Sequence, residues 1–307
     1  MSKTSERKGR HRRYRTSQRY YWAMMLPGLL LVTVFDYVPM LGVLMAFQNY
    51  VPAKGIWGSA FVGLKHFRSM LSIPDCWEIF RNTLVISLGK MLGIMFVAIS
   101  FAILLNEIKH VRLKKVTQTI VYLPHFISWV VLAAVVKNIL GLDGMLNYFL
   151  NLVGLEPLNF RGSNALFQPM LIGTYIWKEF GYSSVIYLAA LTSVDPGLHE
   201  AAAIDGAGWW RRVWHVTLPG ILPVVLVMAA MDIASILSAG FDQVYNLYTP
   251  LVYESGDIID TYVYRVGLLG RQYSFGAAVG LLKSVVGMIL MLSMNEFAKK
   301  FANRRIF

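Results

Sequence analysis

The stretch Glu200–Pro219, EAAAIDGAGWWRRVWHVTLP, separates two long apolar regions and holds two short helical patterns joined by a turn. Asp195 can cap a helix whose first residue is Pro196, where the missing N–H has no cost. Gly206 can adopt the positive φ that ends this helix after about two turns. WWRRVWHV then resumes as an amphipathic segment before Leu218 and Pro219. Because so short a helix is marginal alone, we expect the neighbouring apolar regions to support it and make it rigid.

The composition is that of a membrane protein. Of 307 residues, 56% are hydrophobic and only 15% are charged, whereas soluble domains average about 25% charged residues. The single cysteine, Cys76, excludes an intramolecular disulfide, and we expect it to pack as a small hydrophobe. The net charge of +12 is concentrated in residues 1–20, which contain eight Lys or Arg. This placement next to an apolar region favours a membrane surface over nucleic acid.

Six regions are long and apolar enough to span a membrane, which takes about 20 residues each. The first continues to about Phe47 without a small-residue cleavage site, so it is interpreted as a retained span rather than a signal peptide. The fourth is the weakest, because Trp177, Lys178 and Glu179 fall near its middle. The spacings Gly89/Gly93 and Gly276/Gly280 should allow close helix packing. We therefore predict an all-α membrane protein with six transmembrane helices, at about 21–47, 79–105, 116–139, 165–192, 217–240 and 274–297.

The distribution of Lys and Arg predicts the orientation. The two terminal segments and the loops 106–115 and 193–216 carry 18 of these residues, whereas the loops 48–78, 140–164 and 241–273 carry 6. Cytoplasmic segments are enriched in Lys and Arg. The prediction is therefore that both termini are cytoplasmic. Residues 1–20 and 298–307 form basic tails around a transmembrane domain at 21–297, which carries a cytoplasmic loop at 195–219.

The residues of this loop leave two uses open. The helix could lie on the lipid headgroups, which its Trp and Arg residues would suit. It could also dock on a soluble cytoplasmic partner and carry motion between that partner and the membrane domain. A DNA-reading helix-turn-helix is disfavoured, because a tether at both ends to membrane spans denies the helix access to a groove.

The loop resembles the EAA loop of binding-protein-dependent ABC importer permeases. That pattern is Glu-Ala-Ala, then Asp-Gly-Ala, and a closing Leu-Pro. The matching residues, with unbroken spacing, are Glu200, Ala201, Ala202, Asp205, Gly206, Ala207, Leu218 and Pro219. The resemblance implies that the segment from Glu200 to Gly206 is a coupling helix, between the fourth and fifth spans, that fits a groove on a nucleotide-binding subunit.

The resemblance extends from about residue 15 to the C-terminus. Segments such as DYVPMLGVLMAFQNY (36–50), YLPHFISWVV (122–131) and IWKEFGYSSVIYLAAL (176–191) are similar to carbohydrate-uptake permeases of the LplB type. This implies import of a sugar, in such permeases an oligosaccharide, across a prokaryotic cell membrane. It also implies three partners: a second, different permease subunit, cytoplasmic ATPase subunits and an extracellular substrate-binding lipoprotein.

The chain carries no motif for ATP hydrolysis of its own. The pattern G-x-x-x-x-G-K-[ST] is absent, and no Cys/His cluster, zincin spacing or G-x-S-x-G occurs. We therefore expect a protein that is not an enzyme and binds no metal or cofactor, with ATP and Mg²⁺ held by the partner ATPase.

Ionisable residues deep in the spans are candidates for a translocation path. Each costs ~2.5–3.5 kcal/mol on insertion, so such residues tend to face the bundle interior or a water-filled cavity. The deep ones are Lys90, Asp232 and Lys283. An ion pair of Asp232 with Lys90 or Lys283 is an equally good interpretation, because it would offset part of the burial cost.

The segment YIWKEFGY (175–182) is the second candidate for that path. Trp177 and Tyr182 could stack on the C–H face of a sugar, while Lys178 and Glu179 could bind its hydroxyls. Since Lys178 and Glu179 are adjacent, we expect them to point in different directions. The alternative is aromatic packing plus one structural salt bridge.

A different function class also fits part of the pattern. In a secondary transporter driven by protons or sodium, Lys90, Asp232 and Glu179 would be coupling sites. Such a protein usually contains an internal inverted repeat, and none is apparent. A membrane-bound enzyme would need a catalytic cluster near a membrane face, and none stands out.

Overall fold

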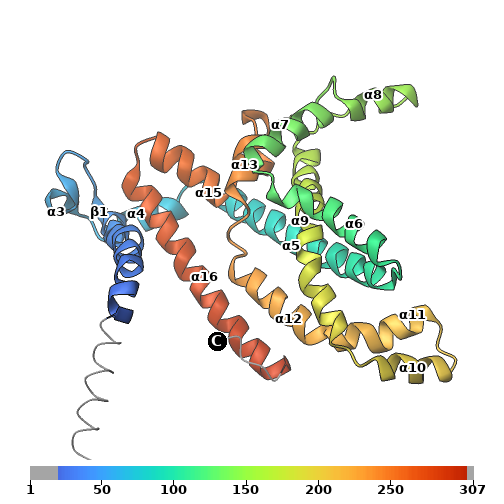
Figure 1. Cartoon of the computed structure of the whole chain (residues 1–307). Helices are drawn as coiled ribbons and strands as arrows, with labels where there is room; N and C mark the ends of the chain where they lie inside the picture. The colour runs from blue at the N-terminus through green and yellow to red at the C-terminus, as the bar shows by residue number, and fades with distance from the viewer. Residues whose placement is uncertain (1–19, 303–307) are drawn as a thin grey trace, which may run out of the picture.

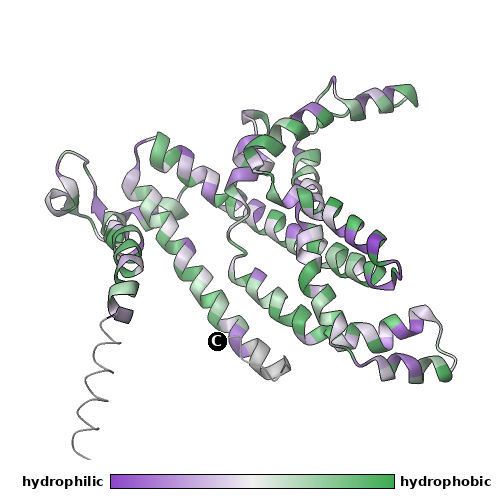
Figure 2. Cartoon of the chain, in the orientation of Figure 1, coloured by the Kyte–Doolittle hydropathy of each residue, from purple (hydrophilic) through white to green (hydrophobic). Residues whose placement is uncertain are grey.

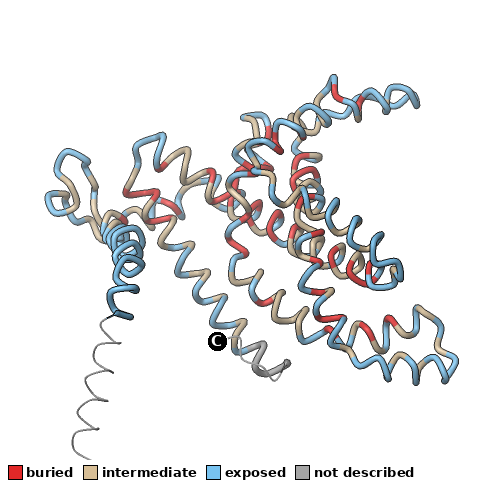
Figure 3. Tube along the Cα trace, viewed as in Figure 1, coloured by how far each residue is buried: buried red, intermediate tan, exposed pale blue. Residues whose placement is uncertain are grey.

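The computed structural model describes residues 20–302 and is built almost entirely of helices (Figure 1). Residues 1–19 of the tail predicted at 1–20, and residues 303–307 of the tail predicted at 298–307, lie outside the described residues. Apolar residues predominate along α12 (Leu218–Ala234) and along residues 273–296 of α16 (Tyr273–Ala302) (Figure 2). The first helix is exposed over residues 20–41 (Figure 3). Among the residues that the structure describes, five helices are long and apolar enough to cross a membrane: Tyr20–Phe47, Cys76–Glu107, Trp129–Leu152, Trp209–Ala234 and Tyr273–Glu296.

The first helix changes its winding around Pro39. Proline has no N–H to donate, so the regular α-helical ladder cannot pass through it. The chain then forms a small antiparallel hairpin in which Gln48 pairs with Phe61 and Asn49 with Ala60. The elements of this region are η1 (Thr33–Tyr37, π-helical), α2 (Val38–Met40), η2 (Leu41–Phe47, 3₁₀), β1 (Gln48–Asn49), α3 (Gly55–Gly58), β2 (Ala60–Phe61) and α4 (Lys65–Leu71).

Helices α5 (Cys76–Glu107) and α9 (Asn164–Thr192) form the centre of the bundle. A Cβ on Gly89 or Gly93 would lie within 2.4 Å of the Ile172 or Ile176 side chain. Because glycine has no Cβ, the two helices can pack closely at these positions. The predicted role of this glycine pair is confirmed. Of the second pair, Gly276 lies against Gly267, but Gly280 has nothing within 4 Å of its Cβ position. The prediction for Gly276/Gly280 is therefore right only for Gly276.

The third predicted span, 116–139, is wrong as a single helix. Its helix is interrupted at Pro124, where the backbone passes through the 3₁₀ turn η3 (Leu123–Phe126) to an extended Ile127. Ser128 then caps a new helix, its Oγ accepting from the Val131 N–H at 3.4 Å. The region is uniformly apolar, but the proline breaks the helix within it. The apolar span instead covers Trp129–Leu152. The helices here are α6 (Val111–Tyr122), α7 (Trp129–Leu140) and α8 (Met145–Leu152).

The fifth predicted span, 217–240, is displaced towards the N-terminus. The amphipathic segment that precedes Leu218 does not end there but continues as one helix from Trp209 to Ala234. Non-helical residues follow up to Gly240, whose φ of +91° turns the chain into the next helix. The parts of this helix are α11 (Trp209–Arg212), η4 (Val213–Thr217, π-helical) and α12 (Leu218–Ala234).

The last third of the chain connects α12 to α16 through short elements. The sixth predicted span, 274–297, lies inside α16, whose C-terminal part points to the same end of the molecule as α10 (Pro196–Ile204), opposite α8 and α13 (Figure 1). The elements are α13 (Phe241–Leu247), η5 (Pro250–Val252, 3₁₀), α14 (Tyr253–Gly256), α15 (Ile259–Tyr262), η6 (Val263–Leu269, π-helical) and α16 (Tyr273–Ala302).

Replacing Gly181 by alanine should destabilise the fold. A Cβ on Gly181 would lie 2.3 Å from the backbone oxygen of Val121, which cannot move aside as a side chain could. Overpacking of this kind costs about 1–3 kcal/mol. Gly173, on the same helix, has nothing within 4 Å of its Cβ position, so Gly173→Ala is the matched control. Thermal unfolding in detergent should show a lower midpoint for Gly181→Ala only. Equal midpoints for the two variants would contradict this packing.

Candidate functional site: a polar pocket and the projecting helix α10

Helix α10 has well-formed caps at both ends. The Asp195 side chain accepts a hydrogen bond from the Gly197 N–H at 2.9 Å, and Pro196 occupies the first helical position. At the other end Gly206 has a φ of +75°, with hydrogen bonds from Gly206 N to Ala203 O at 3.1 Å and from Ala207 N to Ala202 O at 2.9 Å. These two bonds form a Schellman motif. The turn expected at Asp205 and Gly206 is thus a defined, rigid helix end.

The EAA residues leave one face of α10 free. Glu200, Ala201 and Asp205 are exposed, and no residue of α10 is buried. Within the described part of the chain the Glu200 carboxylate has no hydrogen-bond or ion-pair partner. Leu218 and Pro219, which close the motif, lie at the start of α12, directly after the π-helical turn η4. Helix α10 therefore presents a supported surface that the fold itself does not use.

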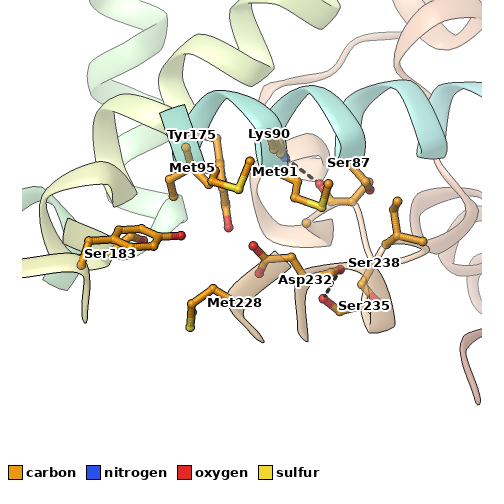
Figure 4. Close-up of a pocket in the computed structure, with 15 residues that line it drawn as sticks. Ser87, Lys90, Met91, Met95, Tyr175, Ser183, Met228, Asp232, Ser235 and Ser238 are labelled. Carbon is orange, nitrogen blue, oxygen red and sulfur yellow. Dashed lines mark hydrogen bonds between the residues drawn. The ribbon is translucent and has the colours of Figure 1, made fainter. Parts of the chain in front are cut away.

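A polar pocket lies between α5, α9, α12 and the segment before α13 (Figure 4). Its volume is about 170 Å³. Lys90 enters from α5, Tyr175 from α9 and Asp232 from α12. Lys90 and Asp232 were predicted from the sequence as deep ionisable residues. The other polar residues of its wall are Ser87, Ser183, Tyr187, Ser235 and Ser238.

Lys90 is the buried cation of this pocket. Only 5% of the residue is exposed, and its ammonium donates to the Ala239 carbonyl at 2.6 Å. The ammonium also lies 4.8 Å from the centre of the Tyr175 ring, a cation–π distance. Nearby, the buried hydroxyl of Ser87 has no hydrogen-bond partner within residues 20–302. Since an ammonium has three N–H donors, the pocket keeps donors that a ligand oxygen could use.

The predicted ion pair between Asp232 and a lysine is absent from the described residues. Lys283 instead bridges Asp260 at 2.5 Å, because it lies on α16 opposite α15, and it lines a separate, mainly apolar cavity with Ile79 and Phe80. Asp232 and Lys90 line the same pocket without a direct ion pair. Of the three deep ionisable residues, only these two are brought together.

The side chains of segment 175–182 face two different regions. Tyr175 lines the polar pocket, whereas Lys178, Glu179 and Tyr182 gather around His125. The expectation that Lys178 and Glu179 diverge is wrong: their charged groups meet at 2.7 Å, since both side chains are long enough to bend towards each other. Glu179 also contacts His125 Nδ1 at 2.6 Å, and His125 stacks on Tyr182 with ring centres 3.9 Å apart. Trp177 is 49% exposed and does not line the pocket.

This cluster has a structural use at the interruption near Pro124. The Lys178 ammonium donates to the His125 carbonyl at 2.8 Å, so it satisfies a backbone acceptor that the broken helix leaves without a partner. The ammonium is also 5.6 Å from the Trp129 ring centre. The geometry therefore matches the structural salt bridge that the sequence left open as an alternative.

The sequence did not single out two tyrosines and the serines of the pocket. Tyr175 and Tyr187 stand on the face of α9 that turns towards α5 and α12, twelve residues apart in a helix whose other Tyr and Trp residues point elsewhere. Serines are common at helix interfaces in membranes, so their identity carried little signal.

Known proteins resemble this chain over most of its length. Residues 93–303 match the family model described as "Binding-protein-dependent transport system inner membrane component". The polygalacturonan/rhamnogalacturonan transport system permease protein YteP of Bacillus subtilis is 44% identical, covering 94% of this chain and 91% of the relative. Protein LplB of the same organism is 39% identical, with the same two coverages.

A solved structure has the same fold. It is the crystal structure of a bacterial alginate ABC transporter in complex with an alginate pentasaccharide-bound periplasmic protein. One of its chains is 34% identical to this protein with a TM-score of 0.86, and the match covers 94% of this chain and 97% of that one. By this family match and these relatives, the chain belongs to the binding-protein-dependent transport system inner membrane components, permease subunits that are not themselves enzymes, and it is a multi-pass permease of the cell membrane.

Proposed function

We propose that this chain is one transmembrane half of an ATP-driven importer and that its polar pocket forms part of the path of an acidic oligosaccharide. The buried ammonium of Lys90, with free donors and neighbouring hydroxyls, is the observation that carries the substrate class. A carboxylate of a uronic acid would be a suitable partner for it. Two similar proteins support this class, since one is named for transport of polygalacturonan and the other belongs to an importer of alginate, an acidic polysaccharide.

The membrane topology that we propose has six spans and two cytoplasmic termini. The sixth span, beyond the five apolar ones, is α9, whose 29 residues reach about 44 Å at 1.5 Å per residue, more than the ~30 Å hydrocarbon core. The excess of Lys and Arg in the terminal segments and in the loops 106–115 and 193–216 supports this orientation. Helix α10 would then face the cytoplasm.

Coupling to ATP hydrolysis would run through α10. The helix is capped, exposed and tied at its end to α11, which continues without a break through η4 into α12. Asp232, which lines the pocket, lies near the other end of that continuous helix. A displacement of α10 by a nucleotide-binding subunit would therefore move one wall of the pocket as a rigid body. This supports a docking element over a helix that only rests on lipid headgroups.

The partners follow from this mechanism. A second permease subunit would complete the pore, cytoplasmic ATPase subunits would bind ATP and Mg²⁺, and an extracellular lipoprotein would deliver the oligosaccharide. In the pocket, Lys90 would bind a carboxylate, Asp232 and the serines would bind hydroxyls, and Tyr175 and Tyr187 would offer ring faces. Of the other residues predicted for the path, Tyr182 would hold the His125 ring in place by stacking on it. Lys178 and Glu179 would hold the interruption at Pro124 in place, and Trp177 and Lys283 would lie outside the pocket.

Purification of the chain with its neighbours tests this function. We expect the detergent-solubilised wild type to retain a nucleotide-binding protein and a second permease, and the reconstituted complex to hydrolyse ATP faster when binding protein and pentagalacturonate are added. The Glu200→Ala, Gly206→Val double variant should lose both the ATPase and the stimulation. A wild type that purifies alone and moves solute only with an ion gradient would instead establish the secondary-transporter alternative.

A further inference from the structure

A row of aromatic side chains starts where the polar pocket ends. Gly240 lines the pocket and is also the residue that precedes α13. Phe241, Tyr245 and Tyr248 follow at spacings of four and three residues, so they share one face of α13 and its C-terminal cap. Tyr253 and Tyr264 are added from the segments that follow. We call these five residues, Phe241, Tyr245, Tyr248, Tyr253 and Tyr264, the aromatic ladder.

The rings of the ladder contact one another in sequence. The ring centres of Phe241 and Tyr245 are 5.2 Å apart and nearly parallel, those of Tyr245 and Tyr248 are 5.9 Å apart, and those of Tyr248 and Tyr253 are 5.1 Å apart. Tyr264 lies 5.0 Å from Tyr245 and 5.3 Å from Phe241. These are the separations of interacting aromatic pairs. The ladder is therefore a continuous track that leads away from the pocket.

The opposite face of α13 anchors the helix, so the ladder is not needed for that purpose. Gln243, Val244 and Leu247 are fully buried. The Gln243 amide donates to the Leu171 carbonyl at 2.7 Å and to the Thr174 hydroxyl at 2.9 Å. Tyr245, at the middle of the ladder, is 39% exposed instead. A helix whose buried face is already complete carries its large rings on the open side.

The ladder also offers hydroxyls and space. A hydrogen bond with Tyr264 raises the pKa of Tyr245, and burial raises the pKa of Tyr248, so both phenols stay protonated and able to donate. A cavity of about 420 Å³ lies against the ladder, with Phe241, Tyr264 and Tyr273 in its wall. Beyond Tyr253 the row ends at the Arg265 guanidinium, which is 4.3 Å from the Tyr253 ring centre and paired with Asp257.

We propose that the aromatic ladder is a second carbohydrate subsite, which binds pyranose units of the oligosaccharide that the polar pocket does not reach. The inference rests on the proposed function, because it takes the transported solute to be an oligosaccharide. A pyranose has an apolar C–H face that stacks on an aromatic ring and a rim of hydroxyls that tyrosine can bind. Because the ladder is continuous with the pocket at Gly240, a long chain contacts both, whereas a disaccharide in the pocket leaves the ladder empty.

Chain-length dependence tests this subsite. In proteoliposomes that hold the full transporter and its binding protein, uptake of digalacturonate and pentagalacturonate is measured for wild type, Tyr245→Leu and Tyr245→Phe. Tyr245→Leu removes the ring and should raise KM for the pentamer about fivefold or more, a loss of ~1 kcal/mol that a single aromatic contact supplies. It should leave KM for the dimer unchanged. Tyr245→Phe keeps the ring and should lie close to wild type.

The control variant is Tyr148→Leu, which removes an exposed tyrosine from α8, outside the ladder, and should alter neither KM. Equal changes for dimer and pentamer in Tyr245→Leu, or no change for either, would overturn the subsite. Binding of pentagalacturonate to the chain in nanodiscs is measured in parallel, with weaker binding expected for Tyr245→Leu and unaltered binding overturning the proposal. If the wild-type transporter takes up neither oligosaccharide, the proposed function fails, and the nanodisc comparison still decides for or against the ladder.

Discussion

Replacing Gly206 by valine is expected to abolish substrate-stimulated ATP hydrolysis and uptake while the chain still inserts into the membrane. Gly206 has a φ of +75°, which a β-branched residue adopts only with strain. An L-residue in this region costs roughly 1–2 kcal/mol, so valine would move the chain out of it and disrupt the Schellman bonds to Ala202 and Ala203. Without that turn α10 loses its fixed direction relative to α11, and the contact with the ATPase subunit is misplaced.

Two variants separate this conformational effect from mere bulk. Gly208 also has nothing within 4 Å of its Cβ position, but its φ of −64° and ψ of 170° suit any residue. Gly208→Val should therefore retain transport, and Gly206→Asn should be intermediate because asparagine tolerates positive φ. The measurement is uptake and ATPase activity at matched membrane expression. Full activity in Gly206→Val, or equal losses in Gly206→Val and Gly208→Val, would remove the backbone argument for coupling.

The sequence predicted helices best where hydropathy and capping agree. The second, fourth and sixth regions lie within α5, α9 and α16, and Asp195 and Gly206 cap α10 as their residue types indicated. Hydropathy failed at Pro124, because an interruption of two or three residues hardly changes the mean over a span. Hydropathy also misplaced the fifth region. The sequence before Leu218 was interpreted as a separate amphipathic segment, but a π-helical turn there lets one helix run from Trp209 to Ala234.

The pocket was predictable only in part because burial cost identifies charges but not their neighbours. Lys90 and Asp232 stood out as expensive residues within apolar spans, and they line the same pocket. Nothing local distinguishes Lys178, which satisfies the backbone at His125, from a lysine that faces a pathway. The aromatic ladder was missed for another reason: α13 is short and lies between spans, so a pattern of three rings falls below any periodicity that a sequence alone can establish.

Replacing Lys90 by methionine is expected to raise KM for pentagalacturonate about tenfold or more. Methionine keeps much of the length and apolar character of the lysine stem but removes the ammonium that lies between Ala239 and Tyr175. A hydrogen bond to a charged group contributes about 1.5–3 kcal/mol, and 1.4 kcal/mol corresponds to a factor of ten. The loss should be larger for an acidic than for a neutral oligosaccharide, because among the described residues that line the pocket the remaining charged side chain would be the Asp232 carboxylate.

Comparison of acidic with neutral sugars makes this prediction specific to charge. Lys137→Met removes a lysine from α7, outside the pocket, and should leave KM for both sugars unchanged. Lys90→Arg keeps the charge, but the ammonium already lies 3.2 Å from the Cβ position of Gly240, so the larger guanidinium should restore transport only incompletely. If Lys90→Met impaired acidic and neutral oligosaccharides equally, Lys90 would support the backbone at Ala239 rather than bind a carboxylate. An unchanged KM for both would place the substrate path outside this pocket, whereas a selective loss for the acidic sugar would identify the Lys90 ammonium as the group that selects substrate charge.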